Sequence, residues 1–300
     1  MPAKKRIIII GGPTAVGKTS IAIAVAKHFH TEIISADSRQ CFKELNIGVA
    51  RPSAEELSQV KHHFIATHSI HQKVTAATFE QYALTKSEEI FLERDVLVIT
   101  GGTGLYIKAF CEGMDEIPEV PSVIRQEIST QYNQNGLQWL QNEIQKIDPA
   151  FYERGEIKNP HRLMRALEVY KSTGKSILSF RTAKKAIRPF EIVKVALELP
   201  KEELHRNIDK RVDMMMQAGL RDEVRSLVPY QHLNALQTVG YKEIFDYLNG
   251  ETDLEQAIHL IKRNTRQYAK RQMTWFKKDP AYHWMKPNET EVIKHFGSLV

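Results

Sequence analysis

A glycine-rich stretch near the start of the chain constrains the fold more than any other feature. Residues 12–19 read GPTAVGKT and fit the pattern GxxxxGK[ST]. The β-branched run 6–10 precedes them, and residues 18–30 carry apolar side chains at helical spacing. A loop between a strand and a helix can turn its backbone N–H groups toward an anion at the helix N-terminus. The stretch therefore predicts a phosphate- or diphosphate-binding loop in an α/β protein.

The residue types of this loop suit an anion and a metal ion. The glycines allow the tight turn, Lys18 supplies a positive charge, and the hydroxyl of Thr19 can bind Mg²⁺. We assign phosphate or diphosphate binding to the whole loop, Gly12, Pro13, Thr14, Ala15, Val16, Gly17, Lys18 and Thr19. The pattern leaves open whether ATP binds there.

Further along the chain, strand patterns alternate with helical ones and then stop. Strands are predicted at 32–36, 95–100 and 193–199, with helices elsewhere after residue 199. Between residues 116 and 190 the strand signals fade, and Asn159-Pro160 predicts the start of a helix. We therefore predict a P-loop NTPase-like α/β fold, a parallel sheet flanked by helices. Its core would comprise residues 1–115 and 191–300, and residues 116–190 would form an inserted helical domain.

The acidic partner that nucleotide hydrolysis usually requires is missing after the best later strand. P-loop NTPases hold Mg²⁺ with a second carboxylate at a strand end, but the strand 95–100 runs into Thr-Gly-Gly-Thr-Gly. Asp37 is the acid that directly follows a core strand, in the crevice where open α/β sheets bind ligands. Its carboxylate could bind a metal, act as a general base, or only cap a turn. The pattern favours a group transfer that leaves the diphosphate intact.

The charge and composition of the chain limit the cellular compartment and the binding partners that we expect for it. The net charge is +6, and residues 262–278 hold seven basic side chains and no acidic one, which indicates either a polyanion-binding surface or a solvated helix face. The two cysteines cannot form a disulfide framework, and the apolar run 7–10 is too short for a membrane span. The histidines at 62, 63, 68 and 71 fit a strand and loop better than a metal site. We expect a reduced, cytoplasmic protein with no membrane partner.

A series of blocks along the chain resembles bacterial tRNA dimethylallyltransferases, the IPP transferase family. In order, the blocks are GPTAVGKT (12–19), DSRQ (37–40), GGTGLYI (101–107), NPHRLMRALEVYKSTGKSI (159–177), FR (180–181), AGLRDEV (218–224), VGYKEI (239–244) and RQYAKRQMTWF (266–276). The resemblance implies transfer of a dimethylallyl group from dimethylallyl diphosphate to N6 of an adenosine. That adenosine follows the anticodon on its 3′ side, at tRNA position 37, in tRNAs that read codons beginning with U.

The resemblance also implies roles for particular residues. Asp37 would be the general base, Lys18 and Thr19 would hold diphosphate and Mg²⁺, Arg211 would bind diphosphate, and Thr103 would contact the donor or the reacting nucleotide. The anticodon stem-loop of tRNA would contact Asp37, Ser38, Arg39, Gln40, Thr103, Arg125, His161, Arg162, Leu163, Met164, Arg165, Lys242, Arg263, Arg266, Lys270 and Arg271. Lys262 lies on the same helical face as Arg266 and Lys270. We expect Tyr268 and Trp275, interleaved with these cations, to pack in the core rather than stack on bases.

Two other classes compete with this interpretation. A P-loop kinase for a nucleoside or small molecule would explain residues 12–19 but not the basic segment 262–278. An RNA-binding nucleotide switch would explain the basic segment, but the sequence lacks a guanine-reading motif. The transferase accounts for both features, and we expect it to act as a monomer.

Overall fold

The computed structural model describes residues 4–182 and 184–298. The chain folds into two compact units. One unit contains the residues up to 112 together with those from 187 onward, and the other contains residues 113–186. No helix among the described residues is both long enough and apolar enough to cross a bilayer.

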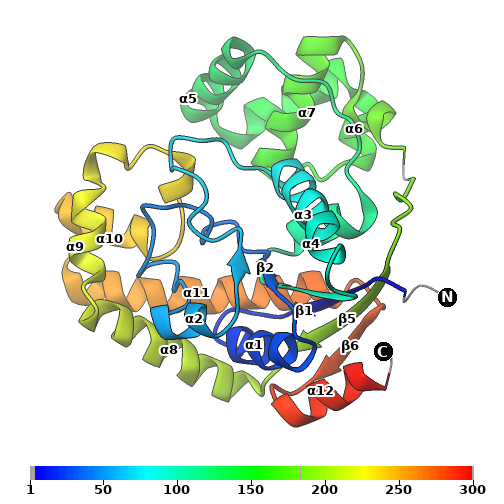
Figure 1. Cartoon of the computed structure of the whole chain (residues 1–300). Coiled ribbons are helices and arrows are strands. Elements are labelled where there is room, and N and C mark those ends of the chain that lie inside the picture. Colours follow the sequence, from blue (N-terminus) through cyan, green and yellow to red (C-terminus); the bar gives the residue numbers. More distant parts are fainter. Residues whose placement is uncertain (1–3, 183, 299–300) are drawn as a thin grey trace. The chain divides into compact units, whose positions relative to one another are not determined.

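The larger unit is built on one parallel sheet with the strand order β3-β2-β4-β1-β5-β6 (Figure 1). The strands are β1 (Arg6–Gly11), β2 (Ile33–Ser35), β3 (His62–His63), β4 (Val96–Gly101), β5 (Glu191–Leu197) and β6 (Tyr282–Met285). The central strand β1 pairs with β4 on one side and with β5 on the other. Its residues Ile7–Ile10 are fully buried, as expected for a strand covered on both faces.

The alternation of side chains along β1 separates two apolar cores. Ile7 and Ile9 belong to a core that includes residues of α3, α4, α10 and α11, whereas Ile8 and Ile10 pack with α1, α8 and α12. The helices of this unit are α1 (Lys18–His28), α2 (Ala54–Gln59), α3 (Ala76–Phe91), α4 (Gly104–Glu112), α8 (Lys201–Gln217), α9 (Leu220–Ser226), α10 (Tyr241–Leu248), α11 (Leu254–Phe276) and α12 (Glu289–Gly297). Short 3₁₀ turns lie at η2 (Val228–Tyr230) and η3 (Asn234–Leu236).

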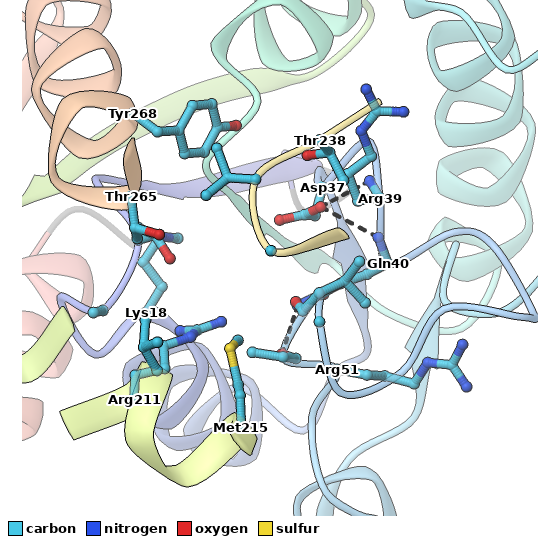
Figure 2. Close-up of a pocket in the computed structure, with 18 of the residues that line it drawn as sticks. Lys18, Asp37, Arg39, Gln40, Arg51, Arg211, Met215, Thr238, Thr265 and Tyr268 are labelled. Carbon is cyan, nitrogen blue, oxygen red and sulfur yellow. Dashed lines mark hydrogen bonds between the residues drawn. The ribbon is translucent and has the colours of Figure 1, made fainter. Parts of the chain in front are cut away.

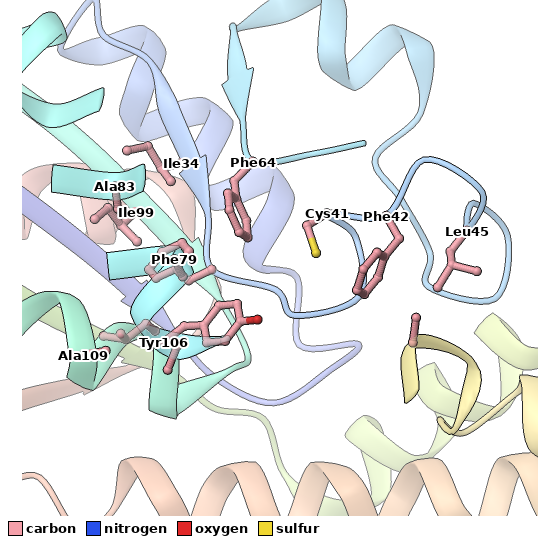
Figure 3. Packing of buried hydrophobic residues seen from close by; sticks show 14 of the residues in the cluster. Ile34, Cys41, Phe42, Leu45, Phe64, Phe79, Ala83, Ile99, Tyr106 and Ala109 are labelled. Carbon is pink, nitrogen blue, oxygen red and sulfur yellow. The ribbon is translucent and has the colours of Figure 1, made fainter. Parts of the chain in front are cut away.

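An aromatic cluster supports the sheet beside β2 and β4. Phe64 meets Phe79 edge to face at 5.2 Å between ring centroids, and Phe79 stacks on Tyr106 at 4.9 Å (Figure 3). Such pairs add to the free energy gained from burying the rings. The cluster anchors α3 and α4, and with them the turn that follows β4.

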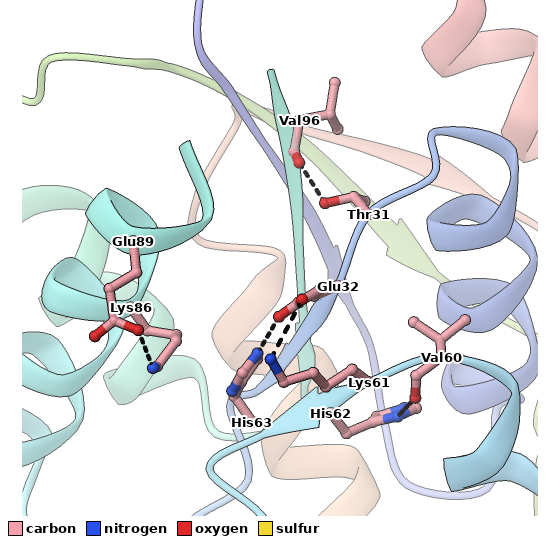
Figure 4. A network of polar contacts seen from close by, with 9 residues as sticks. All are labelled: Thr31, Glu32, Val60, Lys61, His62, His63, Lys86, Glu89 and Val96. Atoms are coloured by element: carbon pink, nitrogen blue, oxygen red, sulfur yellow. Dashed lines mark hydrogen bonds and ion pairs between the residues drawn. The ribbon is translucent and has the colours of Figure 1, made fainter. Parts of the chain in front are cut away.

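Polar contacts fix the short edge strand β3. Glu32, just before β2, binds His63 Nε2 at 2.5 Å and Lys61 Nζ at 3.4 Å (Figure 4). These contacts come from both residues that flank His62, and they seat β3 against β2. The prediction that this histidine pair lies on a strand is confirmed.

The strands predicted from sequence at 6–10, 32–36, 95–100 and 193–199 are present, with ends shifted by at most two residues. The prediction that the chain is purely helical after residue 199 is wrong, because β6 adds an edge strand beside β5. The segment YHWM contains two strand-favouring aromatic residues but is only four residues long, too short to show a clear period of two. It becomes a strand through its pairing with β5.

The smaller unit is helical throughout its regular structure, with α5 (Ser122–Ile147), α6 (Pro149–Arg154), α7 (Pro160–Thr173) and a 3₁₀ turn η1 (Ile177–Phe180). Gly136, at φ 71°, interrupts α5. The predicted start of α7 is confirmed, because the Asn159 side chain accepts a hydrogen bond from the backbone N–H of Arg162. This unit has its own apolar core, in which Leu163 is fully buried.

Candidate active site

A pocket of about 1020 Å³ opens at the carboxyl ends of the central strands. The loop after β1, the turn after β2 and the end of β4 meet there because all three strands run parallel. Side chains of α8 and α11 and the segment 237–243 complete the lining. Figure 2 shows Lys18 and Arg211 side by side on one side of the pocket, with Asp37 across from them.

The loop after β1 has the backbone of an anion-binding turn. Gly12 and Gly17 have φ of 145° and 97°, and Ala15 takes a positive φ of 63° although it is not glycine. A Cβ on Gly12 would lie 2.8 Å from the carbonyl oxygen of Leu197. The helix α1 begins directly afterwards, and no side chain caps its N-terminus at Gly17. Its first N–H groups therefore remain available for an anion.

Two cations face this loop without an acidic partner. Lys18 Nζ donates a hydrogen bond to the carbonyl oxygen of Pro13 at 2.7 Å, and Arg211 on α8 lies nearby. Neither side chain forms an ion pair within the described part of the chain. Burial and the neighbouring Arg211 lower the pKa of Lys18 to about 7, against the opposing influence of Asp37, and burial lowers the pKa of Arg211 as well. An anion that bound between them would relieve this repulsion.

The affinity for inorganic diphosphate should therefore fall as the pH rises through 7. Lys18 is charged below that pKa and loses its charge above it. Binding therefore takes up one proton, and the affinity should fall by at most roughly tenfold for each pH unit above the pKa. Calorimetry across pH 6 to pH 8.5 would measure this slope. The Lys18→Arg variant is the control, because arginine keeps its charge while the titration of the ligand is unchanged. Equal slopes for both proteins would contradict the assignment.

Asp37 caps a turn and also presents an oxygen to the pocket. Its Oδ1 accepts hydrogen bonds from the backbone N–H groups of Arg39 at 2.9 Å and Gln40 at 3.2 Å. Its Oδ2 has no hydrogen-bond partner among the described residues, and Figure 2 shows it pointing away from this turn. The two interpretations of Asp37 as a cap and as a reactive carboxylate are thus compatible, because each uses a different oxygen.

The turn after β4 forms hydrogen bonds to the loop that carries Asp37. The hydroxyl of Thr103 accepts a hydrogen bond from the backbone N–H of Ser38 at 3.0 Å and donates to the Ser38 hydroxyl at 3.3 Å. A Cβ on Gly101 would lie 2.2 Å from the carbonyl oxygen of Ala36, so only glycine permits this approach. Thr103 itself does not line the pocket. The structure gives it a supporting contact with the loop 37–40, which is predicted to contact tRNA.

The side chains of Arg39 and Gln40 line the pocket but already bind protein groups. Arg39 Nη1 donates to the carbonyl oxygens of Asn234 and Ala235 at 3.0 and 3.2 Å. The amide of Gln40 donates to the carbonyl oxygens of residues 49 and 50 and accepts from the hydroxyl of Ser35. Both side chains therefore fix the shape of the pocket wall.

All the predicted site residues except Thr103 fall into three groups. The pocket is lined by Thr14, Ala15, Gly17, Lys18, Thr19, Asp37, Ser38, Arg39, Gln40, Arg211, Lys242 and Arg271. Absent from the lining are Gly12, Pro13 and Val16 in the phosphate loop, and Arg263, Arg266 and Lys270 on α11. The third group, Arg125, His161, Arg162, Leu163, Met164 and Arg165, lies on α5 and α7 of the helical unit.

The burial of one of these residues and the ion pairs of two basic residues bear on the predicted contacts with tRNA. The buried side chain of Leu163 has no exposed surface with which to contact RNA. On α11, Arg266 forms a bidentate pair with Asp209 of α8 at 2.6 and 2.8 Å, and Lys262 pairs with Asp213 at 2.6 Å. These two cations are less available to phosphate than Arg263 and Lys270, which form no ion pair within the described residues.

The prediction that Tyr268 and Trp275 pack in the core is wrong. Each is 37% exposed. Tyr268 lines the pocket with Arg271 over its ring, and Trp275 rests on Gly104, where a Cβ would lie 2.1 Å from the indole. Both lie on α11 and are partly in contact with solvent.

Sequence reasoning assigned no role to Glu223, which holds another wall of the pocket. Its carboxylate accepts hydrogen bonds from the backbone N–H groups of Asn46, Ile47 and Gly48 and from the hydroxyl of Tyr241. The segment 48–52 that it supports lines the pocket. The block AGLRDEV contains Glu223, but a carboxylate with a purely supporting role gives no separate sequence signal.

The donor set suits a magnesium ion held jointly with a diphosphate. Thr19 and Asp37 supply a hydroxyl and a carboxylate in the same pocket, and Mg²⁺ commonly combines one or two such ligands with substrate phosphates and water. No cluster of three or more histidine, cysteine or acidic side chains suited to a metal ion occurs in the described residues. The residues thus fit a metal that arrives with its ligand rather than one held in a protein cage.

The fold and the site together define a P-loop-like α/β protein in which a glycine-rich loop and the carboxylate of Asp37 line one pocket. The sequence model of the IPP transferase family matches residues 40–279. A curated tRNA dimethylallyltransferase of Cytophaga hutchinsonii is 46% identical over 292 residues, which are 97% of this chain and 96% of that protein. The tRNA dimethylallyltransferase 1 of Bacteroides thetaiotaomicron is 46% identical over 96% of this chain and 94% of its own. The chain belongs to the IPP transferase family.

The solved structures agree with this assignment. The full-length tRNA isopentenylpyrophosphate transferase from Bacillus halodurans matches with a TM-score of 0.72 and 33% identity, over 99% of this chain and 95% of its own. The corresponding transferase from Staphylococcus epidermidis matches with a TM-score of 0.71 and 30% identity, over 99% and 98%. The predicted α/β fold class is thereby confirmed.

Proposed function

We propose that this chain transfers a dimethylallyl group from dimethylallyl diphosphate to N6 of the adenosine on the 3′ side of the anticodon. The substrates would be tRNAs that read codons beginning with U. One observation carries the proposal: in the same pocket, Lys18 and Arg211, which form no ion pair among the described residues, lie across from Asp37, whose Oδ2 has no hydrogen-bond partner there. The names of relatives that match nearly the whole chain support it.

The cationic side of the pocket would stabilise the leaving group. As the bond from the prenyl carbon to the bridging oxygen breaks, the electron pair leaves with the diphosphate. Lys18, Arg211 and the N-terminus of α1 face this developing negative charge. A Mg²⁺ ion held by Thr19 together with the phosphates would neutralise further charge. Met215 and Val239 also line the pocket and offer an apolar surface to the dimethylallyl chain.

The carboxylate across the pocket would take the proton. The amine nitrogen forms the new bond to carbon and gives up a proton, which Asp37 Oδ2 is free to accept. Because Oδ1 remains bonded to two backbone N–H groups, the carboxylate keeps its orientation while it reacts. The turn directly after β4, residues 102–104, has no acidic residue, which accords with a reaction that does not cleave between phosphorus atoms.

We propose that tRNA contacts α11 and the helical unit, and that the basic residues of α11 contribute unequally to the affinity for tRNA. Removing Arg263 and Lys270 together should weaken stem-loop binding by about tenfold and reduce the salt dependence of binding. Removing Lys262 and Arg266 together deletes the same charge, but these residues neutralise Asp213 and Asp209, so the loss should be smaller. Binding titrations at several salt concentrations compare the two variants. Equal losses and slopes would mean that the ion pairs do not govern the contact.

A direct assay distinguishes this function from a P-loop kinase. Purified protein with Mg²⁺ is given labelled dimethylallyl diphosphate and an unmodified anticodon stem-loop, with AMP as a competing acceptor. We expect label on the RNA and none on AMP. A parallel reaction supplies ATP and nucleosides without the prenyl donor. Phosphorylation there, with no label on RNA in the first reaction, would replace the transferase with the kinase.

A further inference from the structure

One buried amide connects the two glycine-rich turns of the site. Gln272, near the end of α11, is 6% exposed. Its Oε1 accepts a hydrogen bond from the backbone N–H of Thr14 at 2.9 Å, and its Nε2 donates to the carbonyl oxygen of Gly102 at 3.0 Å. The side chain thus ties the phosphate loop after β1 to the turn after β4.

The packing around Gln272 leaves it little freedom to do anything else. A Cβ on Gly102 would lie 2.1 Å from its Nε2, and a Cβ on Gly11 would lie 2.7 Å from the ring of Phe276, one turn further along α11. The helix therefore lies directly on the carboxyl ends of β1 and β4. Any shift of Gln272 would therefore displace both turns.

The bond to Thr14 matters because the phosphate loop holds an unusual backbone. Gly12 and Ala15 flank Thr14 closely and both have positive φ, a conformation that costs free energy for alanine. The N–H of Thr14 is committed to Gln272. That N–H is therefore used to fix the loop, and the remaining N–H groups of the loop and of α1 are left for the anion.

We propose that Gln272 is a positioning residue that holds the phosphate loop in its anion-binding shape before the donor arrives. It acts through Thr14 and Gly102. The proposal rests on the proposed function only for the identity of the donor, because the loop's affinity for inorganic diphosphate can be measured without any transfer.

Two substitutions separate positioning from general stability. Gln272→Leu leaves the N–H of Thr14 and the buried carbonyl oxygen of Gly102 without partners, so we expect diphosphate affinity to fall by about 10- to 100-fold. Gln272→Glu keeps an acceptor for Thr14 but, when ionised, cannot donate to Gly102 and places a negative charge behind the loop. When protonated, the same side chain can make both hydrogen bonds again, and its burial raises its pKa.

The experiment measures inorganic diphosphate binding by calorimetry from pH 5.5 to pH 8.5 for the wild type and Gln272→Glu. Gln256→Glu makes the same change at an exposed position near the start of α11 and serves as the matched control. We expect the affinity of Gln272→Glu, relative to wild type, to recover as the pH falls, and that of Gln256→Glu to stay near wild type throughout. Lys18, Asp37, Arg211 and Arg271 face the same pocket in all three proteins.

The same variants are then assayed for transfer, where Gln272→Glu at high pH should raise the KM for dimethylallyl diphosphate more than it lowers kcat. A pH-independent affinity ratio near one for Gln272→Glu would overturn the proposal, even if Gln272→Leu fails to fold. If the wild type binds diphosphate but transfers nothing, the proposed function fails while the role of Gln272 is still decided by binding.

Discussion

The Asp37→Asn variant should lose transfer by about 10²- to 10⁴-fold while it still binds the tRNA stem-loop. Asparagine keeps an Oδ1 that can accept from the N–H groups of Arg39 and Gln40, so the turn after β2 should survive. The amide nitrogen that replaces Oδ2 cannot take a proton from an amine. Single-turnover rates at saturating donor and RNA would report the chemical step alone.

The Asp37→Ala variant is the informative comparison, because it removes the cap as well as the base. It should be as inactive as Asp37→Asn and also less stable to heat, by the loss of two backbone hydrogen bonds. Weak RNA binding by Asp37→Asn, together with normal turnover at saturation, would show that Asp37 binds the acceptor and is not the base.

The Lys18→Met variant should lower kcat/KM for the prenyl donor by about 10²- to 10³-fold. Methionine nearly fills the space of the lysine chain but leaves Arg211 as the single side-chain cation of the pair that faces the leaving diphosphate. Stem-loop affinity should change little. Steady-state kinetics with varied donor concentration would measure the effect.

A matched control for this substitution lies on the same helix. Lys27 is near the end of α1, exposed, and bonded to Gln59 rather than to any group of the pocket. Lys27→Met should leave the kinetics near wild type. Similar losses of kcat/KM in Lys18→Met and Lys27→Met would mean that a general reduction of positive charge explains the effect, and not a contact between Lys18 and the diphosphate.

The parts of the site that sequence predicted are those set by local chain geometry. The spacing of Gly12, Gly17 and Lys18 requires a particular loop between a strand and a helix, and Asp37 follows its strand by two residues. Asn159-Pro160 marked the start of α7 because capping is also a local interaction. In each case the residues that define the feature lie close together along the chain.

The parts that sequence missed depend on residues that meet only in the folded chain. Gln272 lies 258 positions from Thr14, and Arg266 lies 57 positions from Asp209. Polar residues on an amphipathic helix give no sign of whether they face solvent, an ion pair or a buried backbone group. The exposure of Tyr268 and Trp275 was misjudged for the same reason, as was the edge strand β6, which forms through its partner β5.

In the proposed reaction, one pocket brings the prenyl donor and a tRNA adenosine together. The most direct measurement is mass spectrometry of nuclease fragments from a tRNA that has been incubated with the protein, Mg²⁺ and dimethylallyl diphosphate. We expect one dimethylallyl group, carried by the adenosine on the 3′ side of the anticodon, and formed at least about 100-fold more slowly by Asp37→Asn. A fully unmodified tRNA, or formation at the wild-type rate by Asp37→Asn, would contradict this expectation.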